Sequence, residues 1–261
     1  MENINVNGLQ RSFLRFGSGE KVFVLLPGLS AEKLTAKGKA VERRWALLAE
    51  THTVYLFDRR DDPPERYDIH AMAEDTVTVM EKLGVHKACL CGISQGGMIA
   101  MDIAVNHPDI VTGLLLCATI SYVNQSLAET LALWASAARE RDSRKLNRIF
   151  TEKLFTEKLL QKFGESLVSV MPTYSEESFV RFLRLIESFE GFDLRERLCE
   201  IRGKVYVIGA GQDKVMGTDS ARELAEALGC GYYVYPDYGH GVYDEAPDFT
   251  DRVRELLQKI E

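Results

Sequence analysis

The sequence lacks an apolar run long enough to cross a membrane. Its longest such runs, residues 22–26 and 111–117, are far shorter than the roughly 20 residues that a membrane-spanning helix requires. Residues 1–7 also lack the basic start and apolar stretch of a signal peptide. We therefore expect a soluble chain with no membrane partner and no signal peptide.

A clustered basic region is missing as well. The formal net charge is −7, and Lys and Arg are spread along the chain. Proteins that bind nucleic acid normally concentrate positive charge on one face. We expect no nucleic-acid partner, and a small molecule is the partner that remains.

The sequence has few cysteines, and they do not show the spacing of a metal-binding motif. The five cysteines are Cys89, Cys91, Cys117, Cys199 and Cys230. Most lie in apolar runs, which is typical of reduced thiols in the core of a cytoplasmic protein. No His or Cys pair stands near them, so we expect no metal site.

What the sequence does contain is an alternation of short apolar runs with longer segments of helical period. The apolar fraction of 46% and the charged fraction of 27% are those of an ordinary globular protein. Such alternation is typical of an α/β fold, with parallel strands buried on both faces and joined by helices. Strands are predicted at residues 4–6, 11–16, 22–26, 54–57, 88–91, 111–117, 205–208 and 232–235, the first two forming a hairpin across Asn7-Gly8. Helices are predicted at 69–83, 95–106, 220–228 and 248–260.

The alternation stops after residue 117. Residues 122–197 show only helical segments, at 127–139, 145–163 and 176–189. We interpret this block as a helical insertion in a core domain made of residues 1–121 and 198–261. An apolar stripe within 127–138 could pack onto the core or cover a substrate pocket, and the sequence leaves both open.

The strongest local pattern is Gly92-Ile93-Ser94-Gln95-Gly96, which follows an apolar strand and precedes a helix. A serine at so sharp a strand-to-helix turn needs small neighbours two positions away on each side, because the backbone is strained and crowded there. The pattern predicts that Ser94 is a nucleophile rather than an incidental serine in a glycine-rich turn.

A serine hydroxyl needs a base to take its proton. Among five histidines, His240 lies in Gly239-His240-Gly241 after the last strand, and the flanking glycines could free the loop to aim the ring. The base should be oriented by an acid that also follows a strand. Asp213, in the glycine-containing loop after residues 205–208, meets that requirement. Because ligands bind at the carboxyl ends of strands in open α/β sheets, the three residues are predicted to meet there.

Acyl transfer also requires donors that stabilise the oxyanion. The backbone amide of Gln95 is one candidate, and that of Leu29, in the turn after residues 22–26, is the other. Four further residues are candidates for lining the substrate pocket: Gly28, Met98, Trp134 and Val215.

These segments together resemble the α/β-hydrolase superfamily, in particular its capped esterase, lactonase and C–C hydrolase branch. Beyond the serine motif, the resemblance rests on residues 25–28, 57–60, 192–198 and 239–241. It implies a mostly parallel eight-stranded sheet with helices on both faces, a helical cap inserted after strand six, a Ser-His-Asp triad and no cofactor. Pro27 replaces a histidine found in many relatives, and residues 61–64, Asp-Asp-Pro-Pro, replace a glycine-rich stretch.

We therefore expect a serine hydrolase that cleaves a small ester, lactone or thioester through an acyl-enzyme on Ser94. Two other hypotheses remain open, because fold does not fix function. One is C–C bond hydrolysis or elimination by the same triad. The other is a ligand-binding protein without turnover. Substrate identity, acyl size and oligomeric state are not determined by these patterns.

Overall fold

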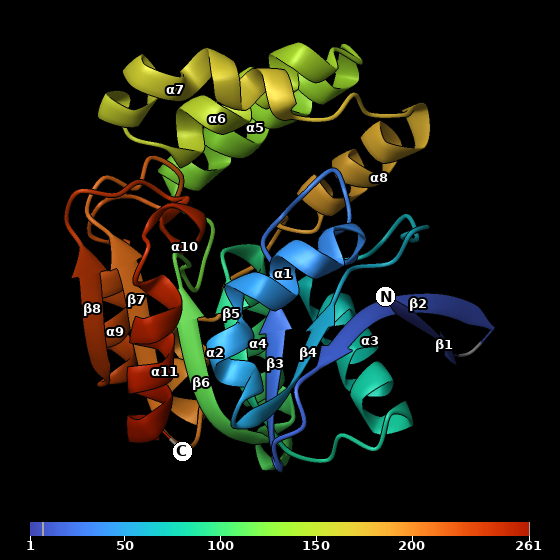
Figure 1. Cartoon of the computed structure of the whole chain (residues 1–261), viewed down its shortest axis with the longest axis vertical. Helices are drawn as coiled ribbons and strands as arrows, with labels where there is room; N and C mark the ends of the chain where they lie inside the picture. Colours follow the sequence, from blue (N-terminus) through green and yellow to red (C-terminus); the bar gives the residue numbers. More distant parts are fainter. Residues whose placement is uncertain (7, 261) are drawn as a thin grey trace.

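The computed structural model describes residues 1–6 and 8–260, and within them one sheet of eight strands forms the centre of the molecule (Figure 1). The strand order is β1-β2-β4-β3-β5-β6-β7-β8. The strands are β1 (Glu2–Val6), β2 (Leu9–Phe16), β3 (Lys21–Leu26), β4 (His52–Phe57), β5 (Ala88–Ile93), β6 (Val111–Cys117), β7 (Val205–Ala210) and β8 (Gly231–Tyr235). The predicted α/β class and eight-stranded sheet are confirmed.

The sheet is parallel from β4 through β8 and antiparallel only where β2 joins it. β2 pairs antiparallel with both β1 and β4, whereas each later pair is parallel. The predicted turn residue Asn7 lies outside the described residues. Parallel strands must be covered on both faces, which explains their continuous apolar sequences.

Helices cover both faces of the sheet, and alternate strand residues contribute to two separate cores. Leu90 and Leu114 pack on the side of α3 (Ile69–Lys82), α4 (Gln95–Asn106) and α9 (Ser220–Leu228). Cys91 and Leu115 pack on the side of α1 (Gly38–Arg44), α2 (Ala46–Ala49), α10 (Val242–Glu245) and α11 (Phe249–Ile260). This division follows from the two-residue side-chain period of a strand.

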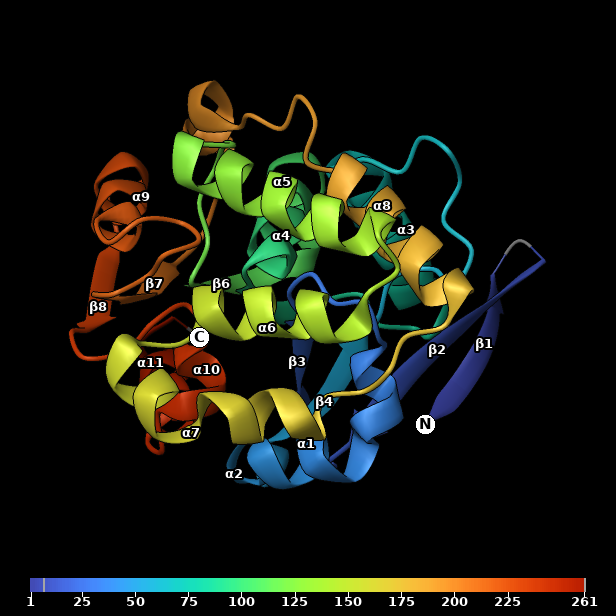
Figure 2. The same cartoon turned by 90° about the horizontal axis from the view of Figure 1, so that it is seen from above.

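Four helices form the insertion between β6 and β7: α5 (Gln125–Arg139), α6 (Ser143–Leu154), α7 (Glu157–Val170) and α8 (Glu176–Glu187). They lie above the carboxyl ends of the strands (Figures 1 and 2). A backbone bridge between Tyr122 and Asp193 joins the two chain segments at the base of the insertion. The predicted position of the helical insertion, after the sixth strand, is therefore confirmed.

The clearest differences from the sequence-based expectation are in the helices. The segment 145–163, predicted as one helix, is divided between α6 and α7, because the side chain of Thr156 accepts a hydrogen bond from the Leu159 amide and begins a new helix. Residues 34–49 contain the short helices η1 (Leu34–Lys37), α1 and α2, which were not predicted. Each has at most seven residues, too few for a helical period to stand out.

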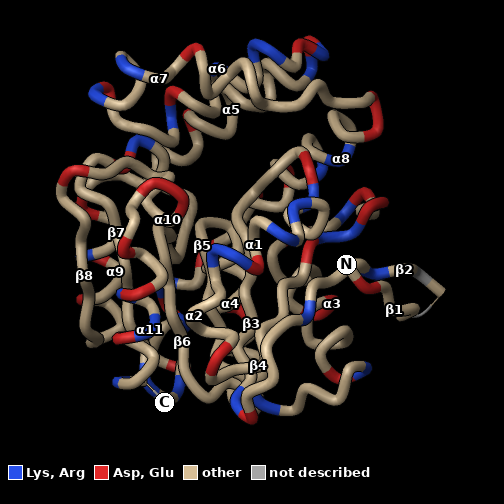
Figure 3. The backbone as a smooth tube through the Cα atoms, viewed as in Figure 1, with Lys and Arg blue, Asp and Glu red and all other residues tan. Residues whose placement is uncertain are grey.

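No helix among the described residues is both long enough and apolar enough to cross a bilayer. Basic and acidic residues are interspersed over the core and the insertion (Figure 3).

Candidate active site

Ser94 lies at the sharp turn between β5 and α4. Its φ of 54° places a non-glycine residue in the left-handed region, which is strained and costs of order 1–3 kcal/mol. The turn is held from both sides, because the Ser94 amide donates to the Cys117 carbonyl (2.9 Å) and the Thr119 hydroxyl donates to the Ser94 carbonyl (2.7 Å). Strain fixed in this way is common at functional sites.

The glycines around Ser94 are required by crowding. A Cβ on Gly92 would lie 2.4 Å from the Gly96 oxygen, and one on Gly96 would lie 2.0 Å from the Leu26 oxygen. A Cβ on Gly97 would lie 2.5 Å from the Thr119 side chain. The spacing of the motif therefore reflects the close approach of the first turn of α4 to the backbone of β5 and of the end of β3, and to the Thr119 side chain after β6.

His240 reaches Ser94 from the loop after β8. Its Nε2 lies 3.1 Å from the Ser94 Oγ, and the residue is 1% exposed. The flanking glycines serve contact with the insertion: the Gly241 amide donates to the Leu154 carbonyl (2.8 Å), and a Cβ on Gly239 would lie 2.6 Å from the same oxygen. The end of α6 thus packs directly on the histidine loop.

Asp213 completes a hydrogen-bonded chain. Its Oδ2 lies 2.8 Å from the His240 Nδ1, while its Oδ1 accepts from the amides of Val215 and Met216, each at 2.8 Å. Asp213 as a whole is 2% exposed. Since it accepts three bonds in a buried position, its orientation toward His240 is fixed.

The two residues proposed as oxyanion donors flank Ser94. Gln95 begins α4, so its amide lies at the positive end of the helix dipole. The loop after β3 lies next to the Ser94 side chain. A Cβ on Gly28 would lie 3.2 Å from the Ser94 Cβ and 3.7 Å from its Oγ. Leu29 follows directly, so both candidate amides belong to segments next to the serine.

A cavity of about 230 Å³ adjoins this site. Gly28 and Leu29 line it, as does Ile93, which precedes the serine. Its other lining residues are Leu25, Pro27, Ser30, Ala31, Leu34, Lys37, Arg44, Trp45, Phe150, Leu154, Met171, Tyr174, Tyr243 and Asp244. The walls therefore combine apolar and polar groups from both the core and the insertion, with charged groups at Lys37, Arg44 and Asp244.

The structure does not place three of the four candidate pocket residues along this cavity; Gly28 alone lines it. Met98 and Val215 are fully buried in the core on the α4 side of the sheet. Trp134 stacks on Phe150 with ring centroids 4.3 Å apart, so it lies behind the residue that forms the wall. The sequence contained no pattern that distinguishes a wall residue from the layer that supports it.

Two arginines next to the site were not singled out from the sequence. Arg59 is buried and donates to the Pro27 carbonyl at 2.5 Å; burial lowers its pKa to about 10. Arg181, on α8, donates through Nη1 to the Ser30 carbonyl at 3.3 Å. Arg59 belongs to a segment shared with the resembling family, whereas Arg181 lies in no recognised motif.

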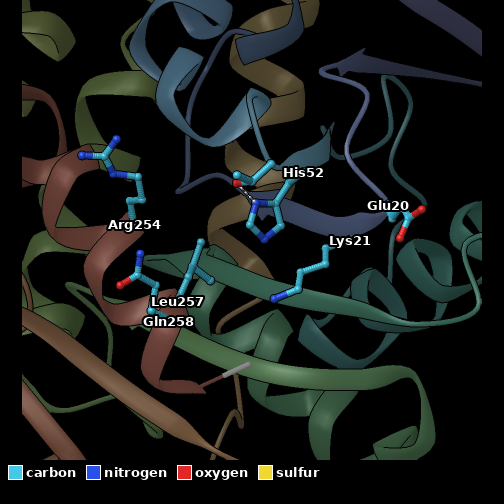
Figure 4. A pocket seen from close by; sticks show the side chains of 7 residues that line it. Glu20, Lys21, His52, Arg254, Leu257 and Gln258 are labelled. Carbon is cyan, nitrogen blue, oxygen red and sulfur yellow. Dashed lines mark hydrogen bonds between the residues drawn. The ribbon is translucent and has the colours of Figure 1, made fainter.

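A second cavity lies at the opposite edge of the sheet (Figure 4). It measures about 460 Å³ and is lined by Glu20, Lys21, Thr51, His52, Arg254, Leu257 and Gln258. Although it is larger, it contains none of the predicted site residues. Among residues 1–6 and 8–260, no cluster of three or more His, Cys, Asp or Glu side chains could hold a metal ion.

Comparison with known proteins agrees with this architecture. The family model described as "alpha/beta hydrolase fold" matches residues 21–247. The chain belongs to the α/β-hydrolase family.

Its relatives within the family differ in their named substrates. A protein of Caulobacter segnis, named carbamate hydrolase RutD, is 36% identical over 94 residues, which is 35% of each chain. A protein of the same name from Rhizobium rhizogenes is 24% identical over 243 residues, covering 81% of this chain and 84% of the relative. The crystal structure of an enol-lactonase from Burkholderia xenovorans superposes with a TM-score of 0.82 over 98% of this chain and 100% of that one, at 21% identity. At that identity the structural likeness establishes the fold alone.

Proposed function

We propose that this protein is a serine hydrolase that cleaves a small ester, lactone or thioester through an acyl-enzyme on Ser94. One observation carries the proposal: the buried chain of hydrogen bonds from Ser94 Oγ through His240 to Asp213, at 3.1 and 2.8 Å. The strained turn at Ser94 and the adjoining cavity support it. The relatives' named reactions, on carbamates and an enol-lactone, also take place at a carbonyl or acyl carbon.

The geometry supports a role for each group. With its Nδ1–H donating to Asp213, the imidazole can accept the Ser94 proton at Nε2 as Oγ attacks the acyl carbon. His240 then gives that proton to the leaving group. Water, activated by the same nitrogen, releases the acyl group from Ser94. Asp213 remains ionised and stabilises the imidazolium, while the Leu29 and Gln95 amides stabilise the oxyanion.

The cavity favours a compact substrate. Ligand sites for drug-sized molecules typically measure about 300–1,000 Å³, and the cavity beside Ser94 measures about 230 Å³. Its small volume and its apolar wall residues, such as Leu29 and Phe150, suit an acyl group of few carbons. We further propose that residues 122–197 act as a cap over this cavity. The cap would lie on a core domain made of residues 1–121 and 198–261. We also propose that the protein acts in the cytoplasm.

The test combines active-site labelling with a substrate panel. A fluorophosphonate probe should label the wild type and fail to label Ser94→Ala. Ser121→Ala is a matched control, because Ser121 is also buried and follows the neighbouring strand β6. Esters and lactones of increasing acyl length should be cleaved by the wild type, with short acyl groups preferred.

Two outcomes would favour the other hypotheses. Ester turnover no faster than that of Ser94→Ala, together with cleavage of a diketone, would favour C–C bond hydrolysis. Ligand-dependent capture of a partner protein that survives Ser94→Ala would favour a binding protein. Equal labelling of wild type and Ser94→Ala would contradict the assignment of the nucleophile.

A further inference from the structure

One helix of the insertion, α8, is hydrogen-bonded to both segments that hold the proposed oxyanion donors. Near its middle, Arg181 contacts the loop that contains Leu29. Near its end, Leu185 and Ser188 contact the side chain of Gln95. Figure 1 shows the loop between β3 and α1 rising toward α8 from the core. The segments that carry the two donors are far apart in sequence, and both are hydrogen-bonded to the same helix.

The loop from Pro27 to Ser30 is held at both ends by buried guanidinium groups. Arg59 donates to the Pro27 carbonyl (2.5 Å), and Arg181 donates to the Ser30 carbonyl (3.3 Å). Gly28 and Leu29 lie between these two anchors. Because both anchors are backbone carbonyls, they constrain the peptide groups of the loop rather than its side chains.

Arg181 also fixes α8 to the core. Its Nε donates to the Arg60 carbonyl at 2.8 Å, and its Nη2 approaches the Arg59 carbonyl at 3.4 Å. The side chain is buried, and burial lowers the pKa of its guanidinium group. A buried cation that donates to three carbonyls has little freedom to move, since each lost bond would leave charge and a carbonyl uncompensated.

The second donor is held by a separate contact. The fully buried Gln95 side chain donates through Nε2 to the Ser188 hydroxyl (3.0 Å) and to the Leu185 carbonyl (3.2 Å). The Ser188 hydroxyl in turn donates to the Leu185 carbonyl (2.7 Å). The residue whose amide follows the nucleophile is therefore fastened to the C-terminal end of α8.

We propose that α8 positions the oxyanion hole, with Arg181 holding the Leu29 amide in place and the contact of Ser188 with Gln95 holding the other. Arg181, Gln95 (through its side chain) and Ser188 are positioning residues. This inference rests on the proposed hydrolase function. It makes docking of the cap a condition for polarising the substrate carbonyl.

Two arginines of α8 provide a matched test. Arg181→Met removes the bonds to residues 30, 59 and 60. Arg184→Met removes bonds from the same helix to Asp62 and Pro63, which lie in the loop after β4 and not in the loop of residues 27–30. We expect Arg181→Met to lower kcat on a short-chain ester at least about 10-fold, since loss of a whole oxyanion donor costs roughly 100- to 1,000-fold. KM should change less than about 3-fold, and Arg184→Met should leave both constants within about 2-fold.

Amide hydrogen exchange tests the same inference without activity. Residues 27–31 should exchange faster in Arg181→Met than in Arg184→Met or the wild type. Arg181→Lys retains the charge but fewer donors, so it should be intermediate, and it replaces Arg181→Met if that variant does not fold. Ser188→Ala should lower kcat with a smaller effect on exchange in residues 27–31, because it loosens the other donor.

The outcomes separate the two proposals. Equal kcat and equal exchange in Arg181→Met and Arg184→Met, with Ser94-dependent turnover intact, would overturn the positioning role of α8 alone. A wild type whose turnover does not depend on Ser94 would overturn the proposed hydrolase function. In that case the exchange comparison would still decide whether α8 controls the loop of residues 27–31.

Discussion

The two edges of the sheet each carry a cavity and a buried histidine, yet they differ in how their polar groups are connected. At the carboxyl edge, His240 lies between Ser94 and Asp213, with both ring nitrogens engaged by side chains. At the amino edge, His52 has the Thr51 hydroxyl at 2.8 Å from Nδ1 and an edge-on contact with Phe23. The six residues of β3 separate the edges by roughly 20 Å.

The larger of the two cavities is not the one beside the proposed catalytic residues. The amino-edge cavity is twice as large, at about 460 against 230 Å³. It is lined mainly by side chains at the ends of β3, β4 and α11 (Figure 4). The carboxyl edge instead has a strained serine and a buried carboxylate that accepts three bonds. The proposed active site therefore differs from the other cavity in its connected set of buried polar groups and not in its volume.

The largest expected effect concerns the two histidines. His240→Asn should reduce ester turnover by about 10⁴- to 10⁶-fold, the range found when members of such triads are removed. His52→Asn should leave kcat within about 2-fold, because it lies at the other edge, although it should lower stability by about 1–3 kcal/mol. Steady-state kinetics and thermal unfolding of both variants check this. Comparable loss of turnover in the two would remove the distinction between the edges.

The next pair concerns the walls of the two cavities. Phe150 lines the cavity beside Ser94, and Leu257 lines the one at the amino edge. Truncation of either buried side chain to alanine should cost about 2–5 kcal/mol. Only Phe150→Ala should move the preferred acyl length upward, because it enlarges the space next to the nucleophile. A shift of the same size in Leu257→Ala would show that acyl length is set elsewhere.

A third pair compares crowded glycines. Gly92→Ala would place a methyl group 2.4 Å from the Gly96 oxygen, and Gly19→Ala would place one 1.9 Å from the Thr51 oxygen at the amino edge. Each should lower the free energy of unfolding by about 1–3 kcal/mol. Fluorophosphonate labelling of the folded protein should slow only in Gly92→Ala. Labelling at the wild-type rate in that variant would indicate that the Ser94 turn tolerates displacement.

The prediction with the smallest expected effect on turnover concerns the pH dependence of cysteine alkylation at the amino edge. Cys230 precedes β8 and is half-buried, and burial raises the pKa of its thiol to about 11. Because the thiolate is the reactive form, iodoacetamide at pH 8 should alkylate the exposed Cys199 much faster than Cys230. The rate at Cys230 should increase about tenfold per pH unit below its pKa. Peptide mass spectrometry, with Cys199→Ser as control, measures both rates; equal rates at pH 8 would contradict the effect of burial.

Sequence by itself determined the strands and the order of the proposed triad. Apolar runs such as 88–91 and 205–208 are recognisable because a strand buried on both faces needs apolar residues at every position. Ser94, Asp213 and His240 each follow such a run, and parallel strands bring their carboxyl ends to one edge. The glycines around Ser94 were also predictable, since crowding at that turn excludes other residues.

Tertiary structure alone decided which side chains surround the serine. Trp134 and Phe150 belong to the same apolar layer, and only the docking of α6 places Phe150 in front. Gly239 and Gly241 were expected to make the histidine loop flexible. In the structure, their lack of side chains instead allows the Leu154 carbonyl to pack against this loop. Arg181 has no local pattern because its acceptors are backbone carbonyls, which any residue supplies. Such contacts depend on where the helical insertion meets the core, and no periodicity along the chain encodes that position.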